Sequence, residues 1–315
     1  MTLRSATMTE TTYRSGFACF VGRPNAGKST LTNALVGQKI AIASSKPQTT
    51  RHAVRGIVTR EDGQLVLIDT PGLHRPRTLL GERLNDLVRE TWAEVDVVGV
   101  CLPCDQRIGP GDRYIVSQIA ELRNKPKIVV LATKTDLVSK ARVLSHLVDV
   151  GKLGEELGIE WADVIPCSAT EDDQLDVVAD VLMGLLPEGP MYYPDGEITD
   201  EPEETLIAEL IREAALEGVR DELPHSIAVM IDEIIPRADR PEDKPLLDVF
   251  ATLVVERDSQ KGIVIGHRGS RLKEIGTEAR QQINRLLGTP VHLSLHVKVL
   301  KEWQRDSKHL NRLGF

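Results

Sequence analysis

Hydrophobic positions in the first 186 residues form two kinds of pattern, short apolar runs and longer stretches with an apolar residue every three or four positions. Short runs predict buried strands, and the 3.6-residue period predicts helices. The expected strands cover residues 17–21, 53–59, 65–68, 95–102, 127–132 and 164–167, and the expected helices cover residues 30–36, 79–94, 111–123, 139–148 and 175–186. Strands that alternate with helices favour an α/β fold with a mostly parallel sheet covered on both faces.

The pattern changes after residue 186. Residues 187–204 are rich in Pro, Gly and acidic residues and poor in aliphatic ones, which is typical of an interdomain linker. The elements expected beyond it are a helix over 205–218, strands over 226–235 and 246–257, a helical stretch broken by glycines, a strand over 291–299 and a short helix over 303–310. This α-β-β-α-α-β order predicts a small α+β domain over 205–315. We expect a disordered leader over 1–14 and a first domain over 15–186.

An eight-residue loop joins the first expected strand to the first expected helix and reads G-x-x-x-x-G-K-S. Glycines let the backbone curl so that successive N–H groups point at phosphate oxygens, and the helix start adds a positive dipole end. Lys28 can reach the β- and γ-phosphates, and the Ser29 hydroxyl can ligate Mg²⁺. The predicted nucleotide-binding residues of this stretch are Gly22, Arg23, Pro24, Asn25, Ala26, Gly27, Lys28, Ser29 and Thr30.

Two further loops follow later strands of the predicted sheet. Ligands bind at the carboxyl ends of parallel strands, so these loops should meet the nucleotide. The Asp136 carboxylate can accept two hydrogen bonds from the N1–H and 2-amino groups of guanine, which adenine does not offer, and the aliphatic part of Lys134 can lie along the base. The predicted base-binding residues are Thr133, Lys134, Asp136, Ser168 and Ala169.

In this order, and with the D-x-x-G stretch that begins at Asp69, the motifs resemble those of the translation-factor-type bacterial GTPases. The resemblance implies that Thr50 ligates Mg²⁺ together with Ser29 when GTP is bound, that Asp69 holds the ion through a water, and that the Gly72 N–H senses the γ-phosphate. Thr49 is the alternative to Thr50, and an ordinary polar role in the loop remains open for either residue.

The chain departs from that family at two positions. Thr133 stands where Asn is usual, and its shorter side chain is expected to make fewer bonds to the base and to the phosphate-binding loop. Leu73 follows the D-x-x-G stretch where Ras-like proteins carry a water-orienting Gln, and leucine cannot hydrogen-bond water. Slow intrinsic hydrolysis is therefore expected. The resemblance suggests that K⁺ held partly by Asn25 supplies the missing charge, although Asn25 is also a common turn residue. The predicted catalytic residues are Lys28, Thr50, Gly72 and Asn25.

Charge is unevenly distributed along the chain. The net charge is −8, yet residues 257–315 carry twelve Lys and Arg against five Asp and Glu, a net +7, which leaves −15 for the first 256 residues. A basic segment behind an acidic body suggests a polyanionic partner for that segment.

Within the basic segment lies a G-x-x-G stretch between two expected helices, the signature of a KH loop, which clamps single-stranded nucleotides. Its glycines let the backbone approach phosphates closely, and Arg268 and Lys273 would contact phosphate. The apolar residues 263–265 and Ile275 would form a floor under the bases. The predicted RNA-binding residues are Ile265, Gly266, His267, Arg268, Gly269, Ser270 and Lys273.

A GTPase domain joined by a short linker to a type II KH domain resembles the Era family of bacterial ribosome-assembly GTPases. The stretches at 48–52 and 69–74 and the ending at 312–315 are similar to that family, and the likeness covers residues 15–315. It implies binding of GTP and GDP with Mg²⁺, binding of 16S ribosomal RNA near its 3′ end on the assembling small subunit, and nucleotide-dependent control of the two domains. It also allows weak peripheral association with the inner face of the cell membrane.

Composition sets the remaining expectations. With 41% hydrophobic residues, four cysteines, no apolar run long enough to span a bilayer and a polar N-terminus, we expect a cytoplasmic protein, and a monomer. Cys101 and Cys104 form a C-x-x-C that we interpret as core cysteines rather than a metal or redox site. Two other functions stay open on sequence grounds: an RNA-binding assembly scaffold with a structural nucleotide, favoured by Leu73, and a P-loop ATPase or kinase, disfavoured by Asp136.

Overall fold

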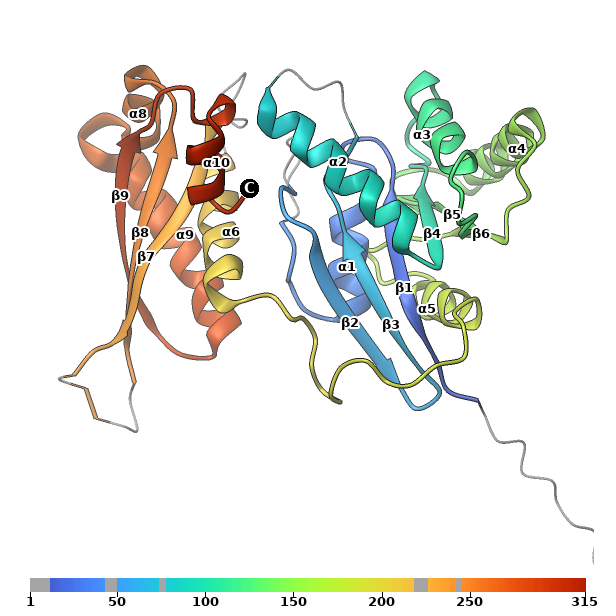
Figure 1. Ribbon diagram of the computed structural model, residues 1–315, viewed down its shortest axis with the longest axis horizontal. Helices are drawn as coiled ribbons and strands as arrows, with labels where there is room; N and C mark the ends of the chain where they lie inside the picture. Colours follow the sequence, from blue (N-terminus) through green and yellow to red (C-terminus); the bar gives the residue numbers. More distant parts are fainter. Residues whose placement is uncertain (1–11, 43–49, 74–77, 218–225, 239, 242–244) are drawn as a thin grey trace, which may run out of the picture.

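The structure is a computed structural model that describes residues 12–42, 50–73, 78–217, 226–238, 240–241 and 245–315. Two sheets, each with its own helices, form two units that lie side by side (Figure 1). The first unit contains β1 (Arg14–Val21), α1 (Lys28–Val36), β2 (Val54–Arg60), β3 (Gly63–Asp69), α2 (Leu79–Glu94), β4 (Val97–Cys101), α3 (Pro110–Ala120), β5 (Lys127–Ala132), α4 (Lys140–Leu157), β6 (Asp163–Pro166) and α5 (Leu175–Gly184).

In the described residues the first sheet has the order β2-β3-β1-β4-β5-β6, and only β2 is antiparallel to its neighbour. Because parallel strands need crossover connections, helices cover both faces. Leu31 of α1 and Leu182 of α5 pack on one face, and Trp92 of α2, Ile119 of α3 and Leu153 of α4 pack on the other. The predicted mostly parallel α/β sheet is confirmed. Its strands end where the phosphate-binding and base-binding loops begin, which brings these loops to one edge.

The acidic stretch 187–202 has no regular helix or strand and runs along the first sheet. The Ile57 N–H donates to the Ile198 carbonyl at 2.9 Å, and the buried Gln64 amide bonds the backbone of Tyr192 and Tyr193. The bond from Ile57 pairs part of the edge that β2 would otherwise expose, and the bonds of Gln64, on β3, hold the stretch against the sheet. The stretch is thus tied to the first unit up to the start of α6.

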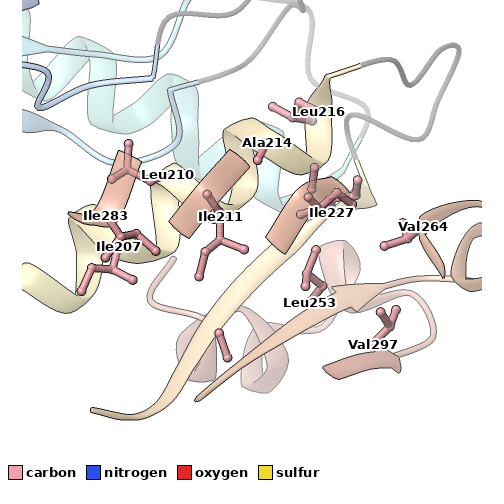
Figure 2. Close-up of a cluster of buried hydrophobic side chains, with 14 of the residues drawn as sticks. Ile207, Leu210, Ile211, Ala214, Leu216, Ile227, Leu253, Val264, Ile283 and Val297 are labelled. Carbon is pink, nitrogen blue, oxygen red and sulfur yellow. The ribbon is translucent and has the colours of Figure 1, made fainter. Parts of the chain in front are cut away.

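The second unit contains α6 (Glu203–Leu216), β7 (Ala228–Pro236), β8 (Leu247–Val255), α8 (Asp258–Ile265), α9 (Ser270–Leu287), β9 (Val291–Val299) and α10 (Ser307–Arg312), with short 3₁₀ turns at His267–Gly269 and Trp303–Arg305. The strands form a β7-β8-β9 sheet in which β9 runs parallel to β8, and the elements follow the predicted α-β-β-α-α-β order. Ile207 and Ile211 of α6, Ile283 of α9, and Leu253 and Val297 of the sheet belong to one apolar core between α6 and the sheet (Figure 2).

A smaller apolar cluster joins the two units. Leu80 and Leu84 of α2 pack with Trp303 and Leu310, which lie in and after the 3₁₀ turn that follows β9. Figure 1 shows α2 and α10 facing one another between the two sheets. Trp303 and Leu310 are both fully buried, so this cluster is a packed interface. Among the described residues, no helix is long and apolar enough to cross a membrane.

Candidate functional site

The phosphate-binding loop is a tight turn that only glycine fits at its first position. Gly22 has a φ of +154°, and a Cβ there would lie 2.7 Å from the Cys101 carbonyl oxygen. Gly27 has a φ of +94° and precedes α1, whose first free N–H groups point back toward the loop. A curled backbone at a helix N-terminus is an anion-binding geometry. The loop is built to hold phosphate.

Lys28 lies inside this loop. Its side chain is buried, with Nζ 3.4 Å from the Gly22 carbonyl oxygen and 3.3 Å from the Arg23 carbonyl oxygen. Burial lowers the pKa of the ammonium group, and the Asp69 carboxylate acts in the opposite direction. An ammonium group held in a ring of backbone atoms can neutralise phosphate charge. The Lys28 ammonium group therefore lies inside the phosphate-binding loop.

Three oxygen-bearing side chains converge beside Lys28. The Ser29 Oγ lies 2.7 Å from Asp69 Oδ2 and 3.2 Å from Thr50 Oγ1, and Thr50 Oγ1 lies 3.1 Å from the same Asp69 oxygen. Within the described residues Asp69 Oδ1 is buried without a hydrogen-bond partner. Desolvation raises the pKa of Asp69, against hydrogen bonds from Ser29 and Thr50 and the charge of Lys28. One carboxylate and two hydroxyls beside a phosphate loop fit Mg²⁺. Thr49, the alternative ligand, lies outside the described residues.

Gly72 faces the phosphate-binding loop. A Cβ on Gly72 would lie 3.6 Å from Lys28 Nζ and 3.8 Å from the Pro24 nitrogen, so its backbone is within reach of a phosphate bound there. Leu73, the next residue, turns away and packs on the core beneath α2 and α3. Its side chain is anchored by apolar contacts and supplies no group that could orient water.

The base-binding loops join the phosphate loop through Thr133. Its hydroxyl donates to the Ala26 carbonyl oxygen at 2.8 Å in a buried position. One bond from Thr133 to the phosphate-binding loop is thus present. Asp136 is exposed, and the Ser168 hydroxyl donates to its Oδ1 at 2.6 Å, while Ala169 follows on the same turn. Lys134 adopts a left-handed conformation with a φ of +60° that turns the loop after β5.

The other predicted residues of the phosphate loop have different surroundings. The Arg23 side chain extends toward α3, where its Nε pairs with Asp112 Oδ1 at 2.7 Å. Pro24 and Asn25 are exposed at the tip, where Asn25 has a φ of +62°, and Thr30 lies half-buried in the first turn of α1. The sequence did not indicate the role of Arg23, since the pairing joins residues far apart in the chain.

The G-x-x-G loop lies between α8 and α9. Gly266 has a φ of +72°, and a Cβ there would lie 2.6 Å from the Arg271 Cβ, so only glycine lets the turn close. The loop side chains His267 and Arg268 are exposed, and Gly269 (φ +81°) leads into Ser270 at the start of α9. Lys273, one turn further, is also exposed. A tight backbone turn at the start of a helix, with exposed cations such as Arg268 and Lys273 beside it, can hold the phosphate backbone of a nucleic-acid strand.

The predicted apolar floor is partly wrong. Val264 and Ile275 are each 1% exposed and belong to the core of the second unit, because their helices turn these side chains toward the sheet. Ile263 is exposed and Ile265 half-buried, so only these two reach the surface beside the loop. The helical period distinguishes them, since Val264 lies on the opposite side of α8 from Ile263.

Arg51, the residue after Thr50, has no role predicted from the sequence. Its side chain is 3% exposed and its NH1 donates to the Ile227 carbonyl oxygen of the second unit at 2.7 Å. The guanidinium carbon lies 5.7 Å from the centroid of the Trp303 ring and 6.0 Å from that of Phe315. Burial and the neighbouring Arg212 lower the pKa of Arg51 to about 9, with Glu209 and Glu256 opposing, so that the group remains charged at neutral pH. The only sequence signal was its place within the stretch 48–52.

Residues 17–134 match a family model described as a 50S ribosome-binding GTPase, and residues 222–304 match one described as a KH domain. GTPase Era of Streptomyces coelicolor is 65% identical over 306 residues, which cover 97% of this chain and 96% of the relative. The chain belongs to the Era family of GTPases. Era of a Nocardioides species is 64% identical over 303 residues, covering 96% of each chain.

Two solved Era structures resemble the whole chain. One is Era in complex with MgGDPNP and nucleotides 1506–1542 of 16S ribosomal RNA, and the other is a variant of Aquifex aeolicus Era bound to GDP·AlF4⁻. Each is 35% identical with a TM-score of 0.89 and covers 96% of this chain and 99% of its own. The predicted family, fold class and KH domain are confirmed.

Proposed function

We propose that this Era-family protein is a GTP-binding and GTP-hydrolysing switch that binds 16S ribosomal RNA near its 3′ end through the KH domain and acts in assembly of the small ribosomal subunit. The observation that carries the proposal is the convergence of Ser29, Thr50 and Asp69 beside Lys28, in a chain that also exposes a G-x-x-G loop. The full-length likeness to an Era complex with 16S RNA supports the small subunit as target. The family description that names the 50S particle covers residues 17–134 alone.

Each residue of the nucleotide site has a proposed role. Lys28 and the amides of the loop from Gly22 to Thr30 hold the phosphates, and Gly72 meets the γ-phosphate. Ser29, Thr50 and Asp69 hold Mg²⁺, which when bound neutralises charge on the β- and γ-phosphate oxygens. Asp136 accepts the guanine donors and Ser168 orients its carboxylate, with Lys134 along the base and Ala169 at the carbonyl edge.

Hydrolysis requires charge stabilisation that Leu73 cannot provide. We propose that K⁺ bound with the help of Asn25 contributes it, which the exposed position of Asn25 at the tip of the loop supports. We expect kcat for GTP to be higher in K⁺ than in Na⁺ at equal ionic strength, and Asn25→Ala to remove the difference. Equal rates in the two salts for the unmodified protein would refute the role of K⁺ and leave nucleotide binding untouched.

The RNA site is tested by charge removal. Because Arg268 and Lys273 are proposed to contact phosphates, Arg268→Ala and Lys273→Ala should each weaken binding of single-stranded RNA corresponding to nucleotides 1506–1542 and reduce the salt slope of log K by about 1. Arg280→Ala is the matched control, since Arg280 is an exposed arginine of α9 further from the loop. If all three variants weaken binding equally, the site lies elsewhere.

The domain division is also a proposal, with a leader over 1–14, a GTPase domain over 15–186, a linker over 187–204 and the KH domain over 205–315. Strand β1 begins at Arg14 and α6 at Glu203, close to these boundaries. We propose that the protein is a monomer that works in the cytoplasm. Peripheral contact with the inner face of the cell membrane is a separate proposal. Ordering of residues 39–52 and 72–78 by GTP is proposed as well, although 43–49 and 74–77 lie outside the described residues.

A further inference from the structure

The side chain of Arg51 extends from the GTPase domain into the KH domain. The guanidinium donates to the Ile227 carbonyl oxygen just before β7 and lies over the faces of Trp303 and Phe315. Arginine over an aromatic face gains cation–π attraction, and the gain is larger where water is excluded. At 3% exposure, the side chain is held on several sides by the KH domain.

The surrounding rings form a continuous stack. The His52 ring stacks on Phe315 at 4.9 Å with an interplanar angle of 14°, and Phe315 stacks on Trp303 at 5.8 Å. The Trp303 indole N–H donates to the Ser226 carbonyl oxygen at 3.1 Å, which fixes the fully buried ring on the KH side. Two consecutive residues of the GTPase domain, 51 and 52, are therefore held by one aromatic cluster of the other domain.

The same cluster is anchored a second time, through α2. Arg83 of α2 donates from NH1 to the Phe315 backbone oxygen at 2.6 Å and to Asn311 Oδ1 at 2.8 Å. Leu80 and Leu84 of the same helix pack with Trp303. The rings that hold Arg51 thus have a fixed position relative to the GTPase domain itself.

We propose that Arg51 is a positioning residue for GTP hydrolysis: the KH-domain contacts of Arg51 hold the preceding residue, Thr50, at the magnesium ligands Ser29 and Asp69. The proposal rests on the proposed GTPase function. Adjacent Cα atoms are about 3.8 Å apart across a trans peptide, so a shift of Arg51 carries Thr50 with it. Thr50 Oγ1 has little room for such a shift, at 3.1 Å from Asp69 Oδ2 and 3.2 Å from Ser29 Oγ. In this arrangement the KH domain supports catalysis even when no RNA is bound.

The contacts favour arginine over lysine. A planar guanidinium can lie flat against rings and still donate in its plane to a carbonyl oxygen, whereas an ammonium group is compact and more strongly hydrated. Arg51→Lys should therefore loosen the contact while keeping the charge. Misplacement of a reacting group by about 1 Å costs up to about a hundredfold in rate, and we expect Arg51→Lys to lower kcat by about tenfold or more.

The test is steady-state GTP hydrolysis by the full chain without RNA, as a function of Mg²⁺ concentration. Arg51→Lys and Phe315→Ala should lower kcat and raise the Mg²⁺ concentration for half-maximal rate, while GDP affinity stays within about twofold, since a threonine that meets the ion only in the GTP state contributes little to GDP binding. Arg55→Ala is the matched control: Arg55 lies four residues along, is exposed and pairs with Asp200 outside the KH domain. It should keep the parental rate and Mg²⁺ dependence.

A double variant separates positioning from general damage. If Arg51 acts through Thr50, adding Arg51→Lys to Thr50→Ala should lower kcat little further, because the effects of residues that act as one unit are not additive. Full additivity of the two losses would overturn the proposal, and so would an unchanged kcat and Mg²⁺ dependence in Arg51→Lys. If the unmodified chain does not hydrolyse GTP, the proposed function itself fails, which distinguishes the two failures.

Discussion

The hydroxyl of Thr133 offers a well-defined perturbation, because it makes one buried bond between the base-binding loop and the phosphate-binding loop. Thr133 is 5% exposed, and its Oγ1 donates to the Ala26 carbonyl oxygen at 2.8 Å. Thr133→Val keeps the shape of the side chain and removes only this donor. The substitution therefore measures how much the Thr133–Ala26 hydrogen bond contributes to stability and to GDP affinity.

The expected loss follows from that single bond. A buried hydrogen bond contributes about 0.5–1.5 kcal/mol net, and a partner left without its donor adds a further penalty, so Thr133→Val should destabilise the GTPase domain by about 1–2 kcal/mol. For a domain of this size the unfolding midpoint should fall by about 2–8 °C. The part of this loss that the unliganded domain does not show should appear in GDP affinity, which falls by at most about 5- to 30-fold.

Thermal unfolding followed by circular dichroism, with and without GDP, and a fluorescent-GDP titration measure both quantities. Thr133→Ser is the matched control, since it retains the hydroxyl and should keep most of the GDP affinity. A Thr133→Val protein as stable as the parent, with unchanged GDP affinity, would refute the claim that this bond holds the two loops together.

Three further predictions follow from other contacts. Burial raises the pKa of Glu209, but the charge and hydrogen bonds of Arg212 outweigh it, so the pKa lies below the ordinary 4.5. The resulting stabilisation is complete above pH 4.5 and is lost as pH falls through the folded-state pKa, so Glu209→Gln should cost about 2 kcal/mol at pH 7, and much less in acid, in urea unfolding. Lys28→Ala should abolish GTP hydrolysis while leaving RNA affinity measurable; retained turnover would contradict its role. Gly266→Ala should weaken RNA binding in a filter assay, whereas Gly262→Ala, where a Cβ meets nothing within 4 Å, should not.

Much of the fold could be predicted from hydrophobic pattern alone. The bounds of α2, β5 and β9 agree with the expected ranges, because each is a long amphipathic or apolar stretch with clear ends. Helix α4 continues to Leu157 instead of ending near 148. A Cβ on Gly154, in the last turns of α4, would lie 2.6 Å from Trp161 Nε1, so this glycine allows a close packing contact between the helix and Trp161. Such a contact cannot be seen in local sequence.

The motifs of the nucleotide site could also be predicted from the sequence, since each is contiguous and follows the end of a strand. The contacts of Arg23 and Arg51 could not be predicted. Arg23 pairs with Asp112, and Arg51 meets Ile227, Trp303 and Phe315, all distant in the chain. From the sequence alone, an arginine beside a motif is interpreted as a surface charge, because its partners are distant in the chain and are known only from the fold. The same holds for Ile275, whose burial depends on how α9 lies on the sheet.

In the proposed switch, the nucleotide bound to the GTPase domain changes the affinity of the KH domain for RNA. The most direct test of this coupling is the affinity for single-stranded RNA corresponding to 16S nucleotides 1506–1542, measured by fluorescence anisotropy with the full chain saturated with GDPNP and Mg²⁺ or with GDP. Tighter binding is expected in the GDPNP state, by about fivefold or more, which corresponds to a coupling free energy of at least about 1 kcal/mol. Equal affinities in the two states, or no RNA binding in either, would contradict it.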